Sequence, residues 1–232
     1  MLSLLALAAT SWLGVTLDEP YSAVYARMGD PIIATKDPHL TKFVYLTDHE
    51  NAFVTVMTER GRIDAETAVV TLGPWSPDLV QKFGYRIPLV RKRGYHMHYS
   101  GGASLDLPLV DKAGGYAMCP MAKGIRITTG AELTGPEALA TPVQLASAEA
   151  SARGLIDLGT RAEPAPWFGT RPCTPDMLPV VGPAPRHRGL WMNFGHGHQG
   201  FTLGPATGRL LAEMMSGETP AVDPTPYGAA RF

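Results

Sequence analysis

The chain has 232 residues, a formal net charge of −1 and a sequence pI near 6.7. This length allows one large domain or two small ones with a substantial core, and the near-zero charge gives no reason to expect nucleic acid or an anionic membrane surface as a partner. Two cysteines, Cys119 and Cys173, are too few for a disulfide framework, so a reducing compartment is expected.

The first fifteen residues, MLSLLALAATSWLGV, are apolar but too short to span a bilayer. A signal peptide begins with a basic region, whereas the first Lys or Arg of this chain is Arg27. We therefore expect a buried helix or an irregular start here, with a weak export signal as the alternative. Residues 16–49 show no clear periodicity, and no element is predicted for them.

The pattern becomes sharper after residue 50. Residues 52–58 alternate and are rich in β-formers, which predicts a strand, and residues 67–72 read as a second, buried strand. The second strand runs directly into Gly73-Pro74-Trp75-Ser76. Ser76 is expected to cap a helix over residues 77–83, which has proline at its favoured first position.

The middle of the chain predicts an antiparallel sheet. Residues 87–99 form a strand interrupted at Gly94, and three short strands follow within residues 108–132, joined by two hairpin turns. An alanine-rich helix is expected over residues 142–158. We therefore predict a mixed, mainly antiparallel sheet from residues 87–132 and 165–172, with this helix packed on it.

Two His-x-His pairs are candidate metal ligands. His96 and His98 share one face of the predicted strand, and His196 and His198 lie a hundred residues further on. No Cys-x-x-Cys motif or acidic ligand frames either pair, so hydrogen-bonded histidines are favoured over a zinc or copper site. A metal-dependent enzyme remains the alternative.

The carboxyl-terminal part reads as a buried strand, 190–194, a glycine-rich turn and an amphipathic helix to residue 215. The first turn of such a helix exposes backbone N–H groups, and it can receive an anion or an electron-rich carbonyl. The turn also matches the Gly-x-Gly-x-x-Gly dinucleotide fingerprint. Only 32 residues follow Gly200, however, and those after Met215 form a proline-rich tail, which leaves no room for the next parallel strand that this fingerprint requires.

A longer pattern surrounds this turn. It consists of Arg171-Pro172-x-Thr174-Pro175-Asp176-x-x-Pro179-x-x-Gly182, then Gly195-His196-x-x-x-Gly200 and Pro205-Ala206-Thr207-Gly208. The combination resembles the carboxyl-terminal signature of a flavoenzyme family that contains D-amino-acid dehydrogenases and oxidases, glycine oxidase and sarcosine oxidase. The Gly-x-Trp-Ser turn at residues 73–76 and the segment from Tyr116 to Glu132 are similar to parts of the same enzymes.

The resemblance implies FAD as the cofactor and an amino acid as the substrate, whose amine is oxidised by hydride transfer to the flavin. It implies no metal and no catalytic side chain, since the protein orients the reactants. The glycine-rich turn before the carboxyl-terminal helix is expected to hold the pyrimidine edge of the flavin. The implied cofactor-binding residues are Gly73, Pro74, Trp75, Gly195, His196, Gly197, His198, Gln199, Gly200, Phe201 and Thr202.

Three residues are implied on the substrate side. Arg171 matches the family's carboxylate-binding arginine. An arginine suits this role because a guanidinium binds a carboxylate in a bidentate manner. The alternative interpretation of Arg171 is a structural arginine paired with Asp176. Tyr116 matches a hydroxyl at the substrate, with a core tyrosine as the alternative. His198 falls where glycine oxidase has a second substrate-facing arginine, and this departure leaves the substrate's identity open.

The implied fold is α/β and α+β: residues 1–86 as a remnant of a Rossmann-like FAD-binding domain, 87–172 as the substrate-binding domain, and 173–232 as the return to the first. The family's first Gly-x-Gly-x-x-Gly turn is missing, since the first fifty residues contain only Gly14 and Gly29. We therefore expect a truncated or split form, with a second chain supplying the nucleotide-binding half. The alternative is a non-catalytic ligand-binding domain without FAD.

The remaining expectations concern partners and location. Oxygen or a quinone-linked carrier is expected as the electron acceptor, and no nucleic acid is expected. We expect a cytoplasmic protein, with peripheral association with the inner membrane as an alternative.

Overall fold

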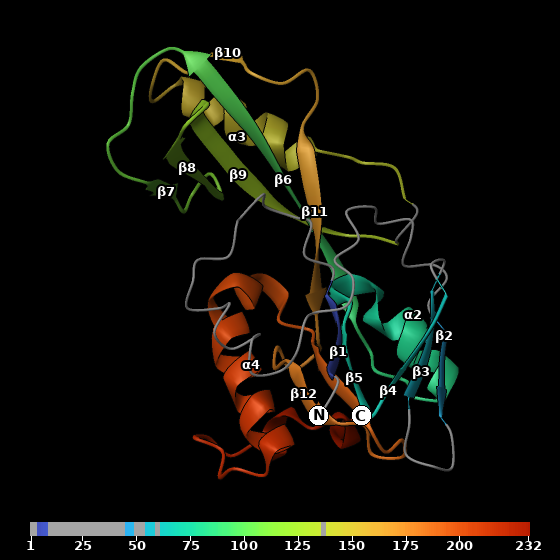
Figure 1. Cartoon of the computed structure of the whole chain (residues 1–232). Helices are drawn as coiled ribbons and strands as arrows, with labels where there is room; N and C mark the ends of the chain where they lie inside the picture. Colours follow the sequence, from blue (N-terminus) through green and yellow to red (C-terminus); the bar gives the residue numbers. More distant parts are fainter. Residues whose placement is uncertain (1–3, 9–44, 49–53, 59–60, 136–137) are drawn as a thin grey trace. The chain divides into compact units, whose positions relative to one another are not determined.

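The computed structural model describes residues 4–8, 45–48, 54–58, 61–135 and 138–232 (Figure 1). The chain divides into two compact units, which we call the split unit, Met1–Leu89 with Pro172–Phe232, and the inserted unit, Val90–Arg171. The assignment of residues 1–86, 87–172 and 173–232 to FAD-binding and substrate-binding domains stays a prediction.

The split unit contains a four-stranded sheet in the order β1 (Leu4–Ala8), β5 (Thr67–Thr71), β13 (Leu190–Phe194) and β12 (Val180–Pro183). β5 is parallel to both of its neighbours, and β12 is antiparallel to β13. Residues 4–8 are therefore a strand, and the expectation of a buried helix or an irregular start was wrong for them. A short apolar run is compatible with either structure, and its pairing with β5 decides between them.

A second sheet of the split unit is a three-stranded antiparallel meander of β2 (Tyr45–Asp48), β3 (Val54–Thr58) and β4 (Gly61–Ala65). β3 confirms the strand expected at residues 52–58, of which 52 and 53 lie outside the described residues. The sequence showed no periodicity that would have predicted β2.

The segment after β5 differs from its prediction. It consists of the 3-10 turn η2 (Gly73–Trp75), the helix α2 (Ser76–Val80) and the 3-10 turn η3 (Gln81–Phe83). Ser76 was expected to cap this helix, but it is the first helical residue and its hydroxyl is buried without a hydrogen bond within the described chain. A residue that already has helical φ and ψ is inside the first turn, so its side chain does not take the capping position.

Helices cover both faces of the β5–β13 pair. Ala68, Val70 and Met192 on one face share a buried cluster with Leu79 and Val80 of α2. On the other face, Val69 packs with residues 210 and 211 of helix α4 (Gly200–Ser216). Strands that are buried on both faces and parallel to each other are typical of α/β domains, which confirms the predicted Rossmann-like part.

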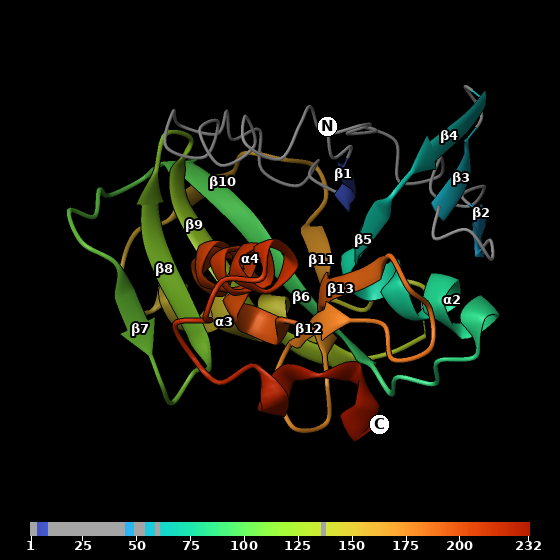
Figure 2. The ribbon, with the colours of Figure 1, turned by 60° about the horizontal axis from the view of Figure 1, so that its bottom comes forward.

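The inserted unit is a mainly antiparallel sheet, which the sequence also predicted (Figure 2). The strand order is β10 (Gly159–Arg161), β6 (Val90–Gly101), β9 (Gly124–Leu133), β8 (Tyr116–Met121) and β7 (Leu109–Asp111), and β11 (Trp167–Cys173) also pairs with β6. Helix α3 (Val143–Arg153) packs on one face through Leu145, Ala148 and Ala152. It ends at Arg153, with Gly154 as its C-cap, earlier than the predicted residue 158.

Alternation along β6 separates two kinds of side chain. Tyr95, Met97 and Tyr99 are buried in the core under α3, whereas His96 and His98 are on the opposite face, as predicted. Among the described residues, no helix is long and apolar enough to cross a membrane.

Candidate functional site

Two glycine turns lie at one edge of the sheet in the split unit. β5 and β13 are parallel neighbours, with Met192 opposite Val70, so their carboxyl ends reach the same edge. Gly73 follows β5 at a φ of +54°, and a Cβ built there would meet nothing within 4 Å. The backbone at Gly73 can therefore be approached closely by a ligand.

The second turn needs glycine for its backbone conformation. Gly195 and Gly197 have φ values of +83° and +56°, which disfavour other residues. A Cβ on Gly195 would lie 3.1 Å from Thr174 Cγ2, and one on Gly197 would lie 3.4 Å from Met177 Cε. Gly200, by contrast, has an ordinary helical φ of −55°. The turn is thus shaped by the segment 173–178 beside it, and only two of its three fingerprint glycines are needed for their φ.

Helix α4 begins directly after this turn, through the 3-10 turn η4 (Gly197–Gln199). No side chain caps the helix, and its first turn contains no acidic residue. His198, Phe201 and Thr202 are exposed, and the Thr202 hydroxyl donates to the Gln199 carbonyl at 3.1 Å. A long helix whose amino terminus is not capped by a side chain favours an anion or an electron-rich carbonyl.

His196 joins the turn to the helix. Its Nε2 lies 2.9 Å from Thr207 Oγ1, and the Thr207 hydroxyl itself donates to the carbonyl oxygens of Leu203 and Gly204. Because the Thr207 hydroxyl proton is used in these bonds, the Thr207 oxygen accepts a hydrogen bond from His196. The His196 ring therefore carries its proton on Nε2. Burial lowers the pKa of His196, which keeps the ring neutral near pH 7. The ring therefore fixes the turn against α4 and does not supply a positive charge.

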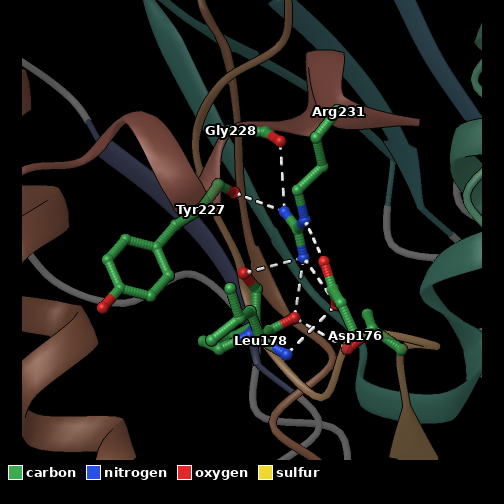
Figure 3. Close-up of polar contacts among 7 residues, drawn as sticks. Asp176, Leu178, Tyr227, Gly228 and Arg231 are labelled. Atoms are coloured by element: carbon green, nitrogen blue, oxygen red, sulfur yellow. Dashed lines mark hydrogen bonds and ion pairs between the residues drawn. The ribbon is translucent and has the colours of Figure 1, made fainter.

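The segment next to the turn is held by the second-last residue of the chain, as Figure 3 shows. Arg231 Nε donates to Asp176 Oδ2 at 2.8 Å, and its Nη2 donates to the Leu178 carbonyl at 2.7 Å. Arg231 also lowers the pKa of Asp176. This pair was not predicted from the sequence, since no local spacing connects residues 55 positions apart. The pair also means that the alternative partner suggested for Arg171, Asp176, is bound by Arg231.

Arg171 lies across a bulge in the sheet of the inserted unit. The register of β6 and β9 shifts between Arg93 and Tyr95, and Arg171 Nη1 donates to the Gly130 carbonyl at 3.2 Å. A Cβ on Gly94 would lie 2.5 Å from Arg171 Cζ, so the guanidinium fills the space that a side chain at this position would take. Arg171 therefore lies on the face of His96, because Gly94 and His96 alternate to the same side of β6.

Tyr116 is on the other face. It is 3% exposed, in the core cluster under α3, and its hydroxyl lies 3.5 Å from Ser151 Oγ. These are the contacts of a core tyrosine, which was the alternative interpretation. The structure thus separates Tyr116 from Arg171 within the inserted unit, and the substrate role of both residues, like that of His198 in the split unit, stays a prediction.

The sheet face turned away from α3 carries a cluster that the sequence analysis did not predict. We call it the open face and define it by Arg171, Trp167, His96, His98 and Arg126. The His96 and Trp167 rings stack with centroids 4.5 Å apart, and His98 Nδ1 lies 3.0 Å from Glu163 Oε1. Burial, and then the charge of Arg126, lowers the pKa of His96 to about 4. Within the described residues, no three His, Cys, Asp or Glu side chains are grouped as metal ligands.

Comparison with known proteins gives one consistent result. A family model described as FAD dependent oxidoreductase matches residues 41–214. The glycine oxidase of Pseudomonas aeruginosa is 36% identical over 178 residues, which cover 76% of this chain and 49% of that protein. The D-amino acid dehydrogenase of Sinorhizobium medicae is 33% identical over 180 residues, or 76% of this chain and 43% of that protein.

A solved structure shares the fold. The iminodiacetate oxidase of Chelativorans sp. BNC1 superposes with a TM-score of 0.67 at 27% identity, covering 89% of this chain and 55% of that one. The chain therefore spans about half the length of the curated relatives that it matches.

Proposed function

The chain belongs to the family of FAD-dependent oxidoreductases, and from this membership we propose that it acts in the oxidation of the amine of an amino acid. The names of the relatives support this reaction class, since they are a glycine oxidase and a D-amino acid dehydrogenase. The proposal includes oxygen or a quinone-linked carrier as the electron acceptor, and a second chain that completes the nucleotide-binding half.

The observation that carries the proposal is the shared edge of β5 and β13. Two turns with positive-φ glycines, Gly73 and Gly195, follow these parallel strands, and the amino terminus of α4 opens beside the second turn. Open space beside Gly73 suits a flat ring system, and the uncapped helix suits its electron-rich carbonyl edge. The residues present therefore fit the isoalloxazine end of FAD, with contacts from residues 73–75 and 195–202.

Bound FAD supplies the acceptor for the hydride that leaves the substrate Cα. The protein's own part is orientation. Arg171 binds the substrate carboxylate through its planar guanidinium, which is held in place by the Gly130 carbonyl and the bulge at Gly94. The backbone N–H groups at the start of α4 stabilise negative charge at the carbonyl edge of the ring. No protein base is needed for a substrate whose amine is unprotonated.

The proposal is tested with Gly73→Ala and a matched control, Gly217→Ala. Both glycines have positive φ, +54° and +70°, and a Cβ on either meets nothing within 4 Å. Each alanine therefore carries a similar backbone strain of about 1 kcal/mol, but only the one at residue 73 enters the proposed ring site. Gly217 caps the far end of α4.

Flavin binding is measured by fluorescence titration with FAD and with riboflavin. We expect the chain to bind FAD weakly and riboflavin about as well, because the described contacts reach only the ring. Gly73→Ala should weaken both, and Gly217→Ala should bind as the unmodified chain does. Equal flavin binding by the two variants would mean that the flavin binds elsewhere. If the unmodified chain bound neither FAD nor riboflavin, the proposal would be contradicted.

A further inference from the structure

The open face carries one arginine beyond Arg171. Arg126 is on β9 opposite His98, and its neighbours Ile125 and Ile127 are buried under α3, so its side chain is on the open face. The hairpin loop residue Lys123 lies close by. Its Nζ pairs with Glu163 Oε1 at 3.3 Å.

The charges of this cluster do not balance. Glu163 is the acidic group here, and it already accepts bonds from His98 and Lys123. Within the part of the chain that the structure describes, Arg126 forms no ion pair or side-chain hydrogen bond, and its Nε is buried without a partner. A partly buried guanidinium without an anion is unfavourable, since buried charges are normally paired.

We propose that Arg126 binds a second acidic group of the substrate, so that the open face accepts an amino acid with a carboxylate in its side chain. The assignment of Arg171 to the α-carboxylate rests on the proposed function, whereas the role of Arg126 as an anion site does not. Gly94, over which Arg171 lies, and His98, opposite Arg126, are four residues apart on β6, or roughly 13 Å. Two long side chains on one face can converge on a single ligand over this distance.

The stacked pair of Trp167 and His96 lies between the two arginines. Trp167 is four residues before Arg171 on β11, and strand alternation places both on the same face. The stack, with ring centroids 4.5 Å apart, offers an apolar surface to the methylene groups that separate the two acidic groups of the ligand. At neutral pH the His96 ring is uncharged, which leaves the two guanidinium groups as the charged ends of the site.

The test compares glutamate with glutamine, each in both chiral forms, by NMR titration of the full chain. These ligands differ in one side-chain carboxylate, so the ratio of their affinities reports the second anion site. We expect glutamate to bind about tenfold or more tightly than glutamine, as for a hydrogen-bonded charge. Arg126→Gln should abolish the preference for glutamate over glutamine, and Arg126→Lys should retain part of this preference. Lys112→Gln removes a charge from the exposed hairpin and should leave the ratio unchanged.

A second readout comes from the ring of His96. Arg126 and Lys123 are the positive groups that act on it, Glu163 is the negative group, and the His98 ring also faces it. Glutamate should raise the pKa of His96 by neutralising Arg126, whereas glutamine should leave this pKa unchanged. Arg126→Gln should raise the pKa of His96 even without a ligand. A merely structural role of Arg126 would not couple ligand charge to this titration.

The outcomes separate the two ideas. Equal affinities of glutamate and glutamine, or an equal loss of both in Arg126→Gln, would overturn the inference. A preference for glutamate that depends on Arg126, in a chain that binds no flavin, would support the inference while the proposed function fails. Flavin binding without that preference would do the reverse.

Discussion

Arg231→Ala should destabilise the split unit and loosen the turn at Gly195–Gly197. The guanidinium is the anchor of the segment that carries Asp176 and Leu178 (Figure 3). That segment in turn supports the turn, since Thr174 and Met177 lie against Gly195 and Gly197. The variant removes this support without touching any residue expected at the flavin.

The magnitude follows from three bonds of Arg231: to Asp176 at 2.8 Å, to the Leu178 carbonyl at 2.7 Å and to the Tyr227 carbonyl at 2.8 Å. The Asp176 side chain is 37% exposed, so its ion pair contributes about 0–1 kcal/mol. Each charged bond to a carbonyl contributes about 1.5–3 kcal/mol. Water can reach the freed carbonyls, so we take the lower values. We therefore expect the free energy of unfolding to fall by about 3 kcal/mol, which lowers Tm by roughly 6–12 °C.

Thermal and urea unfolding at several pH values measure this loss, with the exposed Arg188→Ala as the control. Arg231 holds the pKa of Asp176 below its ordinary value of 3.8. The ion pair therefore stabilises the fold above pH 4, and its share is lost as the pH falls through the folded pKa. The difference in stability between Arg231→Ala and the unmodified chain should therefore shrink slightly in acid, while the contribution of the hydrogen bonds to the backbone carbonyls remains. A Tm equal to that of Arg188→Ala at pH 7 would refute the anchoring role.

Two further changes probe the side chains around the sites. Gly94→Ala should displace the Arg171 guanidinium and weaken binding of an amino acid relative to its decarboxylated amine by about tenfold or more. The same loss is expected for Arg171→Ala, and an unchanged ratio in NMR titration would mean that Arg171 is not the anchor. Thr207→Val removes the acceptor of the His196 Nε2 proton and should lower the free energy of unfolding by about 1–3 kcal/mol near pH 7. Unchanged urea unfolding would show that the ring bonds elsewhere.

Local patterns were sufficient for the elements whose signal lies within one stretch of chain. The strand at residues 190–194, the glycine turn and the helix that follows are contiguous, and their period and turn residues are local properties. The same holds for the hairpins of the inserted unit and for the shared face of His96 and His98. The family signature around residue 171 is likewise a property of the sequence alone.

Residue roles that depend on a neighbouring element were not readable in this way. Tyr116 begins a strand whose alternate side chains lie on opposite faces, and the sequence pattern does not say which face is buried. Only the packing of α3 decides this. Ser76 looks like a helix cap by type, but the 3-10 turn before it shifts the helix start by one residue.

The flavoenzyme signature, the strand–turn–helix unit and the antiparallel sheet can all be predicted from local sequence patterns. Which charged side chains meet depends instead on how the elements pack. Arg231 reaches Asp176 across 55 residues, Arg171 lies over Gly94 where β6 and β9 shift register, and Arg126 lies opposite His98, whose partner Glu163 also pairs with Lys123. The physical reason is that strand pairing and side-chain reach bring together residues that no sequence spacing relates.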